Sequence, residues 1–317
     1  MSLQLHFVNL ALRLFEKPYL ARVQDPAEAR ARLAQLAEIW FVRPAGASYQ
    51  EARLGKIRAL EASQGRVDRR RILVWFHGGA YFQGSPETHR HLGAALSGLT
   101  GARVLLPDYR LAPEHPFPAA IEDALASWRA LMEAGYDPAR IAVGGDSAGG
   151  GLAFGLLHLL QEQGLAVPAC LIAFSPWVDL TLSGASLERN ALADVMVPAS
   201  RMAEVRDRYL AGADPADPRA SPVFGRFRDP PPALIQASRA EILEDDATAL
   251  AHRLTEAGGQ VRLEFWRDTP HAWQLFQGWL PEADAALDAA GAFLRRHLGG
   301  EEAAGLDPGA EAQPAYS

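Results

Sequence analysis

A serine between glycines, at the junction of a strand and a helix, constrains this chain more than any other feature. Residues 144–150 have the sequence GGDSAGG, after the apolar segment 140–143 and before the helix-forming segment 150–163. Strand, sharp turn and helix in this order predict a strained conformation for Ser147, with its hydroxyl clear of the backbone. Gly145 and Gly149 lack a Cβ, which would collide across so tight a turn. The pattern predicts an exposed nucleophile beside the N–H groups of a helix N-terminus.

Alternating strand and helix patterns surround this turn. A polar–apolar alternation at 51–61 predicts an antiparallel hairpin at one edge of a sheet. Buried strands are expected at 71–76, 103–106, 140–143, 170–174, 233–237 and 261–266, and helices at 86–99, 119–133, 150–163, 245–257 and 281–298. The alternation predicts an α/β fold with a mostly parallel, eight-stranded sheet covered by helices on both faces.

Two parts of the chain do not follow this alternation. Residues 1–44 contain two amphipathic helices, and segment 179–228 has helical pieces but no strand pattern. An insertion of that length above a sheet is typical of a lid. The N-terminal helices fit either a lid or a membrane surface, and their weakly basic polar faces favour the lid. We therefore expect a catalytic domain at 45–298, a lid from 1–44 and 179–228, and a disordered tail at 299–317.

Composition limits the classes of function. The chain has 317 residues, 49% of them apolar, and a net charge of −7 at pH 7. This charge argues against nucleic-acid binding and against attraction to anionic membranes. The single cysteine, Cys170, lies in an apolar run, so neither a disulfide nor a zinc framework is expected, and a reducing, cytoplasmic location fits. The first residues lack the basic start and unbroken apolar core of a signal peptide.

A glycine-rich loop follows the strand expected at 71–76. It has the sequence HGGAYFQGS over residues 77–85 and precedes a helix. Adjacent glycines allow backbone N–H groups to turn inward, although an ordinary glycine turn has the same composition. Together with the N–H of Ala148, those of Gly78 and Gly79 would form an oxyanion hole.

A serine nucleophile needs a base, and the chain has nine histidines. An imidazole with a pKa of about 6.5 can accept a proton at neutral pH. His271 alone follows the last expected strand, in a loop before the final helix. For a serine nucleophile on such a strand–turn–helix turn, a histidine late in the chain fits the known order of the three catalytic residues. The order serine, acid, histidine then places the acid after a strand between residues 147 and 271.

Five segments resemble the motifs of a known family, in order and in spacing. They are HGGAYFQGS at 77–85, DYRLAPEHPFPAA at 108–120, GGDSAGG at 144–150, FSPWVDL at 174–180 and DTPHAW at 268–273. The chain resembles the bacterial hormone-sensitive-lipase-like esterases (family IV), in the branch with the nucleophile motif GDSAGG, from about residue 5 to residue 298. The resemblance implies an α/β-hydrolase fold, a helical lid, and hydrolysis of short- to medium-chain carboxylic esters without a cofactor. Ala80 stands where a third glycine is commoner, which keeps a backbone N–H but reduces the space for the acyl group.

An acidic cluster follows the strand expected at 233–237. The resemblance implies an acid at the head of an acid-x-Leu-x-Asp segment, and EILED at 241–245 fits with Glu241 as that acid. Glu244 and Asp246 are interpreted as solvated charges, and Asp245 as a candidate N-cap of the next helix. Asp146 is a rival for the acid, but its place inside the sharp turn favours a role in bracing the neighbouring loops.

Four aromatic residues beside these motifs are candidate walls of an apolar substrate pocket, and each also fits core packing. They are Tyr81, Phe82, Trp177 and Trp273. The predicted ligand is a small-molecule ester, with no metal, no nucleic acid and no stable membrane insertion.

Two other functions are compatible with the residues: an amidase or peptidase that uses the same triad, and a non-catalytic ligand-binding protein of the same fold. The strand expected at 261–266 is the last one and therefore lies at an edge, which must be covered or paired. The resemblance favours a homodimer joined there.

Overall fold

The fold is organised around one eight-stranded sheet, and the computed structural model describes residues 2–299. The strand order is β1-β2-β4-β3-β5-β6-β7-β8; β1–β2 and β2–β4 pair antiparallel and the remaining pairs are parallel. The strands are β1 (Ala47–Leu54), β2 (Ile57–Gln64), β3 (Asp68–Phe76), β4 (Ala102–Pro107), β5 (Ile141–Asp146), β6 (Cys170–Phe174), β7 (Ala233–Ser238) and β8 (Val261–Trp266). The predicted hairpin and parallel strands are confirmed, and β8 is an edge strand.

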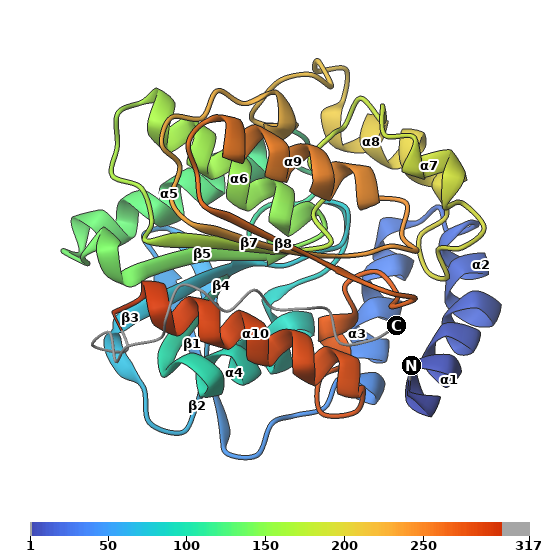
Figure 1. Cartoon of the computed structure of the whole chain (residues 1–317), viewed down its shortest axis with the longest axis horizontal. Helices are drawn as coiled ribbons and strands as arrows, with labels where there is room; N and C mark the ends of the chain where they lie inside the picture. The colour runs from blue at the N-terminus through green and yellow to red at the C-terminus, as the bar shows by residue number, and fades with distance from the viewer. Residues whose placement is uncertain (1, 300–317) are drawn as a thin grey trace, which may run out of the picture.

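Helices cover both faces of the sheet (Figure 1). One face carries α4 (Pro86–Thr100) and α10 (Pro281–His297), and the other carries α5 (Ala119–Glu133), α6 (Ala148–Glu162) and α9 (Glu244–Glu256). In β3, Ile72, Val74 and Phe76 pack in the core that includes α5 and α6, whereas Leu73 and Trp75 pack in the core with α4 and α10. Because successive side chains of a strand point to opposite faces, a strand buried on both faces is continuously apolar.

The helix boundaries follow local capping signals. Ser85 and Thr88 form a capping box at the start of α4, and Gly101 ends this helix in the left-handed conformation at φ 65°. The Asp25 side chain accepts a hydrogen bond from the Ala27 N–H at the start of α3 (Pro26–Trp40). Within residues 2–299, no helix combines the length and apolar character needed to cross a membrane.

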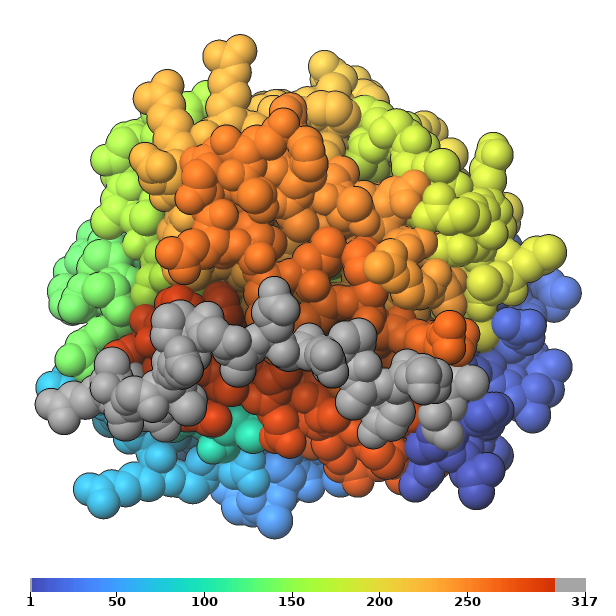
Figure 2. Space-filling view, in the orientation of Figure 1, coloured from blue at the N-terminus to red at the C-terminus, as the bar shows by residue number. Residues whose placement is uncertain are grey.

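The N-terminal helices and the mid-chain insertion lie against each other at one end of the molecule (Figures 1 and 2). The N-terminal part comprises α1 (Leu3–Ala11), a π-helical turn η1 (Leu12–Glu16), α2 (Lys17–Leu20) and α3. The insertion contains α7 (Ser186–Arg189), η3 (Ala199–Arg201), α8 (Met202–Leu210) and η4 (Pro222–Phe224).

Basic side chains join these two parts through backbone carbonyls. Lys17 Nζ donates to the carbonyl of Ala191 at 2.7 Å, and Arg201 Nη2 donates to that of Val23 at 2.8 Å. Every residue of segment 179–228 is described, and none belongs to a strand, as expected. The tail predicted at 299–317 lies outside the described residues except for Gly299.

Candidate functional site

Ser147 stands in a strained turn between β5 and α6. Its backbone has φ 53° and ψ −121°, a region that non-glycine residues rarely adopt. The Ser147 N–H donates to the Phe174 carbonyl at 2.8 Å, and its carbonyl accepts from the Trp177 N–H at 3.0 Å. A Cβ on Gly149 would lie 2.0 Å from the Phe76 carbonyl oxygen. The turn can therefore pass this close to β3 only with glycine there, as the sequence predicts.

The glycine loop lies beside this turn, at the end of β3. Within the described residues, neither the Gly78 nor the Gly79 N–H donates to a backbone acceptor. Ala148 is the first residue of α6, so its N–H has no partner inside the helix. All three residues adjoin Ser147 or the cavity that Ser147 lines. These N–H groups are available to an anionic oxygen next to the serine.

Asp146 connects the turn that bears Ser147 with the glycine loop and with the neighbouring strand and helix. Its Oδ1 accepts from the Trp75 indole at 3.0 Å, and its Oδ2 lies 3.2 Å from His89 Nε2. Burial raises the pKa of Asp146, but the charge and hydrogen bond of His89, the Trp75 hydrogen bond and nearby His77 together lower it more, so the pKa falls below its ordinary value. A Cβ on Gly78 would lie 2.2 Å from Asp146 Oδ2, so the glycine loop approaches this carboxylate closely. Asp146 therefore supports the loops, and within residues 2–299 the hydrogen-bond partner of His271 Nδ1 is Glu241.

The proline-rich loop at 108–120 supports the glycine loop from another side. The Tyr109 hydroxyl donates to the His77 carbonyl at 2.7 Å, and the two rings stack with centroids 4.3 Å apart. The Ala112 N–H donates to the Tyr81 carbonyl at 2.9 Å. Burial lowers the pKa of His77 to about 3, so this ring is a neutral structural group at physiological pH.

His271 and Glu241 form a buried pair. His271 Nδ1 lies 2.7 Å from Glu241 Oε2, and the other carboxylate oxygen accepts from the Ser238 N–H at 2.8 Å. Burial lowers the pKa of His271, but the hydrogen bond and charge of Glu241, together with the charges of Asp194 and Asp146, raise it more, so the net shift is upward. Because a carboxylate accepts, Nδ1 carries the proton and Nε2 of a neutral His271 is free to receive one.

Two serines fix the loop that bears His271. Ser175 Oγ accepts from the Ala272 N–H at 3.1 Å, and Ser238 Oγ donates to the Thr269 carbonyl at 2.6 Å. These contacts hold both sides of the histidine on the ends of β6 and β7. Ser175 stands within a segment that the resemblance singled out, but Ser238 had no signal beyond its place after a strand.

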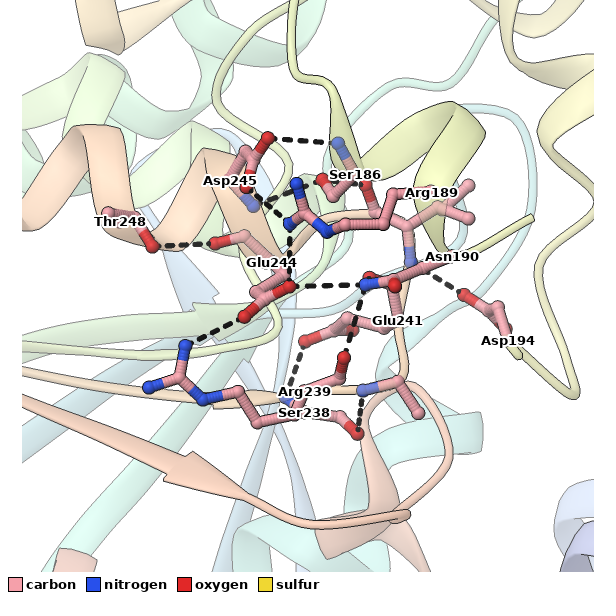
Figure 3. A network of polar contacts seen from close by, with 12 residues as sticks. Ser186, Arg189, Asn190, Asp194, Ser238, Arg239, Glu241, Glu244, Asp245 and Thr248 are labelled. Carbon is pink, nitrogen blue, oxygen red and sulfur yellow. Dashed lines mark hydrogen bonds and ion pairs between the residues drawn. The ribbon is translucent and has the colours of Figure 1, made fainter. Parts of the chain in front are cut away.

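The insertion holds the loop that bears Glu241 (Figure 3). Asn190 Nδ2 donates to the carbonyls of Arg239 at 3.1 Å and Glu241 at 2.9 Å, and Asp194 Oδ2 accepts from the Ile242 N–H at 3.0 Å. Asn190 and Asp194 belong to no recognisable sequence motif. They lie about fifty residues before Glu241, in a segment without regular periodicity, and no local pattern connects them to it.

The interpretation of Glu244 and Asp246 as solvated charges is wrong. Glu244 is 8% exposed and pairs with Arg189 and Arg239, each at 2.7 Å, as Figure 3 shows. Asp246 is 3% exposed, and its Oδ2 accepts from the N–H groups of Val178 and Asp179 at 2.8 and 2.9 Å. Burial raises the pKa of Asp246 to about 8. Both carboxyl groups are covered by the insertion and by the segment that leads into it.

Asp245 is not the N-cap of the following helix. It lies in the first turn of α9, and the N-cap position belongs to Leu243. Asp245 Oδ2 accepts from the Ser186 N–H at 2.9 Å, and Oδ1 pairs with Arg189 at 2.7 Å (Figure 3). A carboxylate in a first turn is favourable with the helix dipole, so its charge still suits this position.

A cavity of about 120 Å³ brings the candidate residues together. Its lining includes Gly78, Gly79, Ser147, His271, Phe82 and Trp177, and lid residues that include Leu20, Leu33, Met196 and Met202. Residues of both the N-terminal segment and the insertion therefore line the same cavity as Ser147. Within residues 2–299, no cluster of three or more His, Cys, Asp or Glu side chains is arranged to hold a metal ion.

Tyr81 and Trp273, two of the four aromatic residues predicted as pocket walls, do not line this cavity. Tyr81 has φ 64°, is buried, and stacks on Tyr209 with ring centroids 3.8 Å apart. Trp273 packs with Leu5 and Val8 of the N-terminal helix, and its indole donates to the Glu282 carbonyl at 3.1 Å. Both residues serve the core, which was the alternative for each.

Known proteins share this sequence and fold. The model of the alpha/beta hydrolase fold family matches residues 73–275. An acetyl-hydrolase from Streptomyces hygroscopicus is 44% identical over 229 residues, which cover 72% of this chain and 77% of the relative. An esterase from Acinetobacter venetianus is 34% identical over 263 residues, covering 83% and 86% of the two chains.

A solved structure of an esterase from the bacterial hormone-sensitive lipase family superposes with a TM-score of 0.89 at 36% identity, covering 94% of this chain and 99% of that one. Sequence and fold agree over almost the whole described chain. The chain therefore belongs to the bacterial hormone-sensitive-lipase family of α/β-hydrolase esterases, and it is a carboxylic ester hydrolase.

Proposed function

We propose that this esterase hydrolyses short- to medium-chain acyl esters through an acyl-enzyme intermediate on Ser147. The observation that carries the proposal is a single cavity lined by the strained Ser147 and by His271, whose Nδ1 is paired with the buried Glu241. No other serine of the described chain combines a strained turn at a helix N-terminus with a histidine–carboxylate pair in the same cavity. Nucleophile, base and orienting acid are the parts that acyl transfer requires.

In the first step, Ser147 Oγ attacks the ester carbonyl carbon while its proton passes to Nε2 of His271. Glu241 holds the proton of His271 on Nδ1 and stabilises the imidazolium that forms. The tetrahedral intermediate then collapses, the bond to the alcohol oxygen breaks, and the imidazolium returns its proton to that oxygen. The alcohol leaves, and the acyl group remains on Ser147.

Negative charge develops on the carbonyl oxygen in both halves of the reaction. The N–H groups of Gly78, Gly79 and Ala148 stabilise this charge by donating hydrogen bonds to the oxygen. The role is supported by the lack of competing backbone acceptors for these groups within residues 2–299. In the second half, His271 removes a proton from water, the resulting hydroxide oxygen attacks the acyl carbon, and the acid leaves as the proton returns to Ser147. No redox step or cofactor takes part in this sequence.

The preference for short to medium acyl groups is supported by the small size of the cavity, about 120 Å³. Lid residues from the N-terminal helices and from the insertion both line it, and Ala80 adds a methyl group beside Gly79. The name acetyl-hydrolase, borne by a relative 44% identical to this chain, agrees with a small acyl group.

The test combines a nucleophile variant with paired substrates. Ser147→Ala should fold normally and lose at least about 10⁴-fold in kcat, and a sulfonyl fluoride should add one label per wild-type chain at Ser147. Hydrolysis of p-nitrophenyl butyrate far above that of the matching anilide supports an esterase. Equal turnover of the two would support an amidase, and turnover of neither a binding protein. Near-normal ester turnover by Ser147→Ala would refute the proposal.

We also propose a homodimer joined through β8. The support is the position of β8 at the edge of the sheet, where Val261, Leu263 and Phe265 are only half-buried.

The cytoplasmic location expected from the single cysteine stays a prediction.

A further inference from the structure

A second apolar cavity lies within the lid, next to the one that contains Ser147. Its walls come from α1, η1, α3 and η5 (Trp273–Phe276), and they include Leu12, Leu36, Trp40 and Phe276. The described lining residues are apolar with two exceptions, Glu16 and Arg32. The site therefore favours a ligand without charge and with few polar atoms.

The two charged residues of this second cavity neutralise each other. Arg32 Nη2 lies 3.0 Å from Glu16 Oε2, and the Arg32 guanidinium also lies 4.1 Å from the centroid of the Tyr19 ring. An ion pair that is already satisfied offers little to a charged ligand, and the remaining wall is hydrocarbon. The π-helical turn η1 supplies Leu12, Phe15 and Glu16 to the wall, and such turns often occur at functional sites.

The second cavity adjoins the first through a shared wall. Leu33 of α3 and Met196 of the insertion line both cavities. Leu275 lines the first cavity and its neighbour Phe276 lines the second, so the boundary also passes between these two residues. Leu33 branches only at Cγ and Met196 is unbranched, so both side chains can change rotamer at low cost.

We propose that the second cavity receives the far end of an aliphatic chain of the ester, and that Leu33 and Met196 control its entry. The inference rests on the proposed function, because the chain is held by the ester carbonyl at Ser147. Each methylene that leaves water for an apolar site favours binding by about fourfold. Two parts of an ester can supply such a chain, the acyl group or the alcohol.

The test compares ratios of kcat/KM for long and short chains below their micelle concentrations. In one series, p-nitrophenyl acetate and octanoate vary the acyl group; in the other, ethyl and octyl acetate vary the alcohol. Leu36→Trp narrows the second cavity and does not border the first. We expect it to lower the long-to-short ratio at least tenfold in one series, and that series identifies the part of the ester that enters.

Two further variants keep the test decisive. Leu33→Ala removes part of the shared wall and should raise the same ratio, which tests the inference even where Leu36→Trp does not fold. Ile39→Trp is the matched control, since Ile39 lies on the same helix, is 67% exposed and borders neither cavity. Its ratios should equal those of the wild type.

The outcomes separate the two proposals. Ratios that are unchanged in both series for Leu36→Trp and Leu33→Ala, with acetate still hydrolysed, would overturn the inference and leave the proposed function intact. A wild-type protein that hydrolyses no ester in either series would overturn both.

Discussion

Replacement of Glu241 by glutamine tests the arrangement around His271 most directly. Glu241 uses both carboxylate oxygens as acceptors, one toward His271 Nδ1 at 2.7 Å and the other toward the Ser238 N–H at 2.8 Å. A glutamine has one oxygen and one NH₂ group in their place. If the oxygen accepts from Ser238, the NH₂ faces Nδ1 of His271 and favours the tautomer with its proton on Nε2. If the amide turns over, the NH₂ meets the Ser238 N–H instead.

The magnitude follows from these two orientations and from the lost charge. Two donors left facing each other in a buried site cost about 1–3 kcal/mol, and the imidazolium formed during the reaction loses its anionic partner. We therefore expect Glu241→Gln to lower kcat by roughly 10²–10⁴-fold, or about 3–5 kcal/mol of barrier, with KM nearly unchanged.

The pH dependence has a definite sign. The reaction requires neutral His271, so kcat/KM falls as the pH drops through the pKa of this residue. Glu241 raises that pKa against the opposing effect of burial. In Glu241→Gln the raising effect of the carboxylate is lost, so burial lowers the pKa of His271. The acidic limb of the kcat/KM profile should therefore move to lower pH. The assay is p-nitrophenyl butyrate hydrolysis from pH 4.5 to 9, in which the released phenol is measured after quenching to alkaline pH.

Asp245→Asn is the matched control from the same acidic cluster. Asp245 pairs with Arg189 near the surface, and an asparagine oxygen can still accept from the Ser186 N–H. The change should cost less than about 1 kcal/mol of stability and leave kcat within about twofold. If Asp245→Asn abolished turnover while Glu241→Gln did not, the assignment of the acid would be wrong by four residues. An acidic limb that stays in place in Glu241→Gln would refute the electrostatic argument.

Three other predictions concern pH-dependent stability, substrate length and assembly. Because the pKa of buried Asp246, about 8, lies above its ordinary value of about 3.9, the native protein binds the extra proton. As the pH rises from about 4 to about 8, this group should therefore lower the free energy of unfolding by up to about 1.4 kcal/mol per pH unit. Asp246→Asn should reduce that slope in urea unfolding, and an unchanged slope would show that Asp246 is ionised. A soluble butyrate ester should be hydrolysed faster than emulsified long-chain triacylglycerol in a pH-stat, and the reverse order would contradict the proposed preference for short to medium acyl groups. Sedimentation at micromolar concentration should show a dimer that a proline at Leu263 weakens, whereas a wild-type monomer would exclude pairing through β8.

Much of the fold and of the candidate site was predictable because short-range rules determine it. The backbone at Gly149 passes so close to the Phe76 carbonyl that a side chain does not fit. The turn is therefore visible in the sequence as a glycine at this position. The strands of the parallel sheet are buried on both faces, so they appear as apolar runs. His271 could be chosen as the candidate base because its position after the last strand depends on chain order alone.

The surroundings of the acid were not predictable because they depend on distant contacts. A run of carboxylates has the composition of a solvated surface, yet Glu244 and Asp246 are covered by residues that lie up to 68 positions earlier in the chain. Tyr81 adjoins the glycine motif, but a positive φ turns its side chain toward Tyr209 and away from the cavity. Neither the cover nor the turn leaves a periodic signal.

The contacts of Asn190 and Asp194 limit how the lid can be exchanged. The insertion that contains them lines the same cavity as Ser147, so it is the natural segment to transplant when a different substrate range is wanted. The same two side chains hold the backbone of residues 239–242, and a graft that lacks them removes both attachments at once. A chimera with a foreign lid should therefore lose turnover on every ester, and restoring asparagine and aspartate at these positions should recover it. We therefore expect the sequence of this segment to change substrate specificity without loss of activity only where the asparagine and the aspartate are kept.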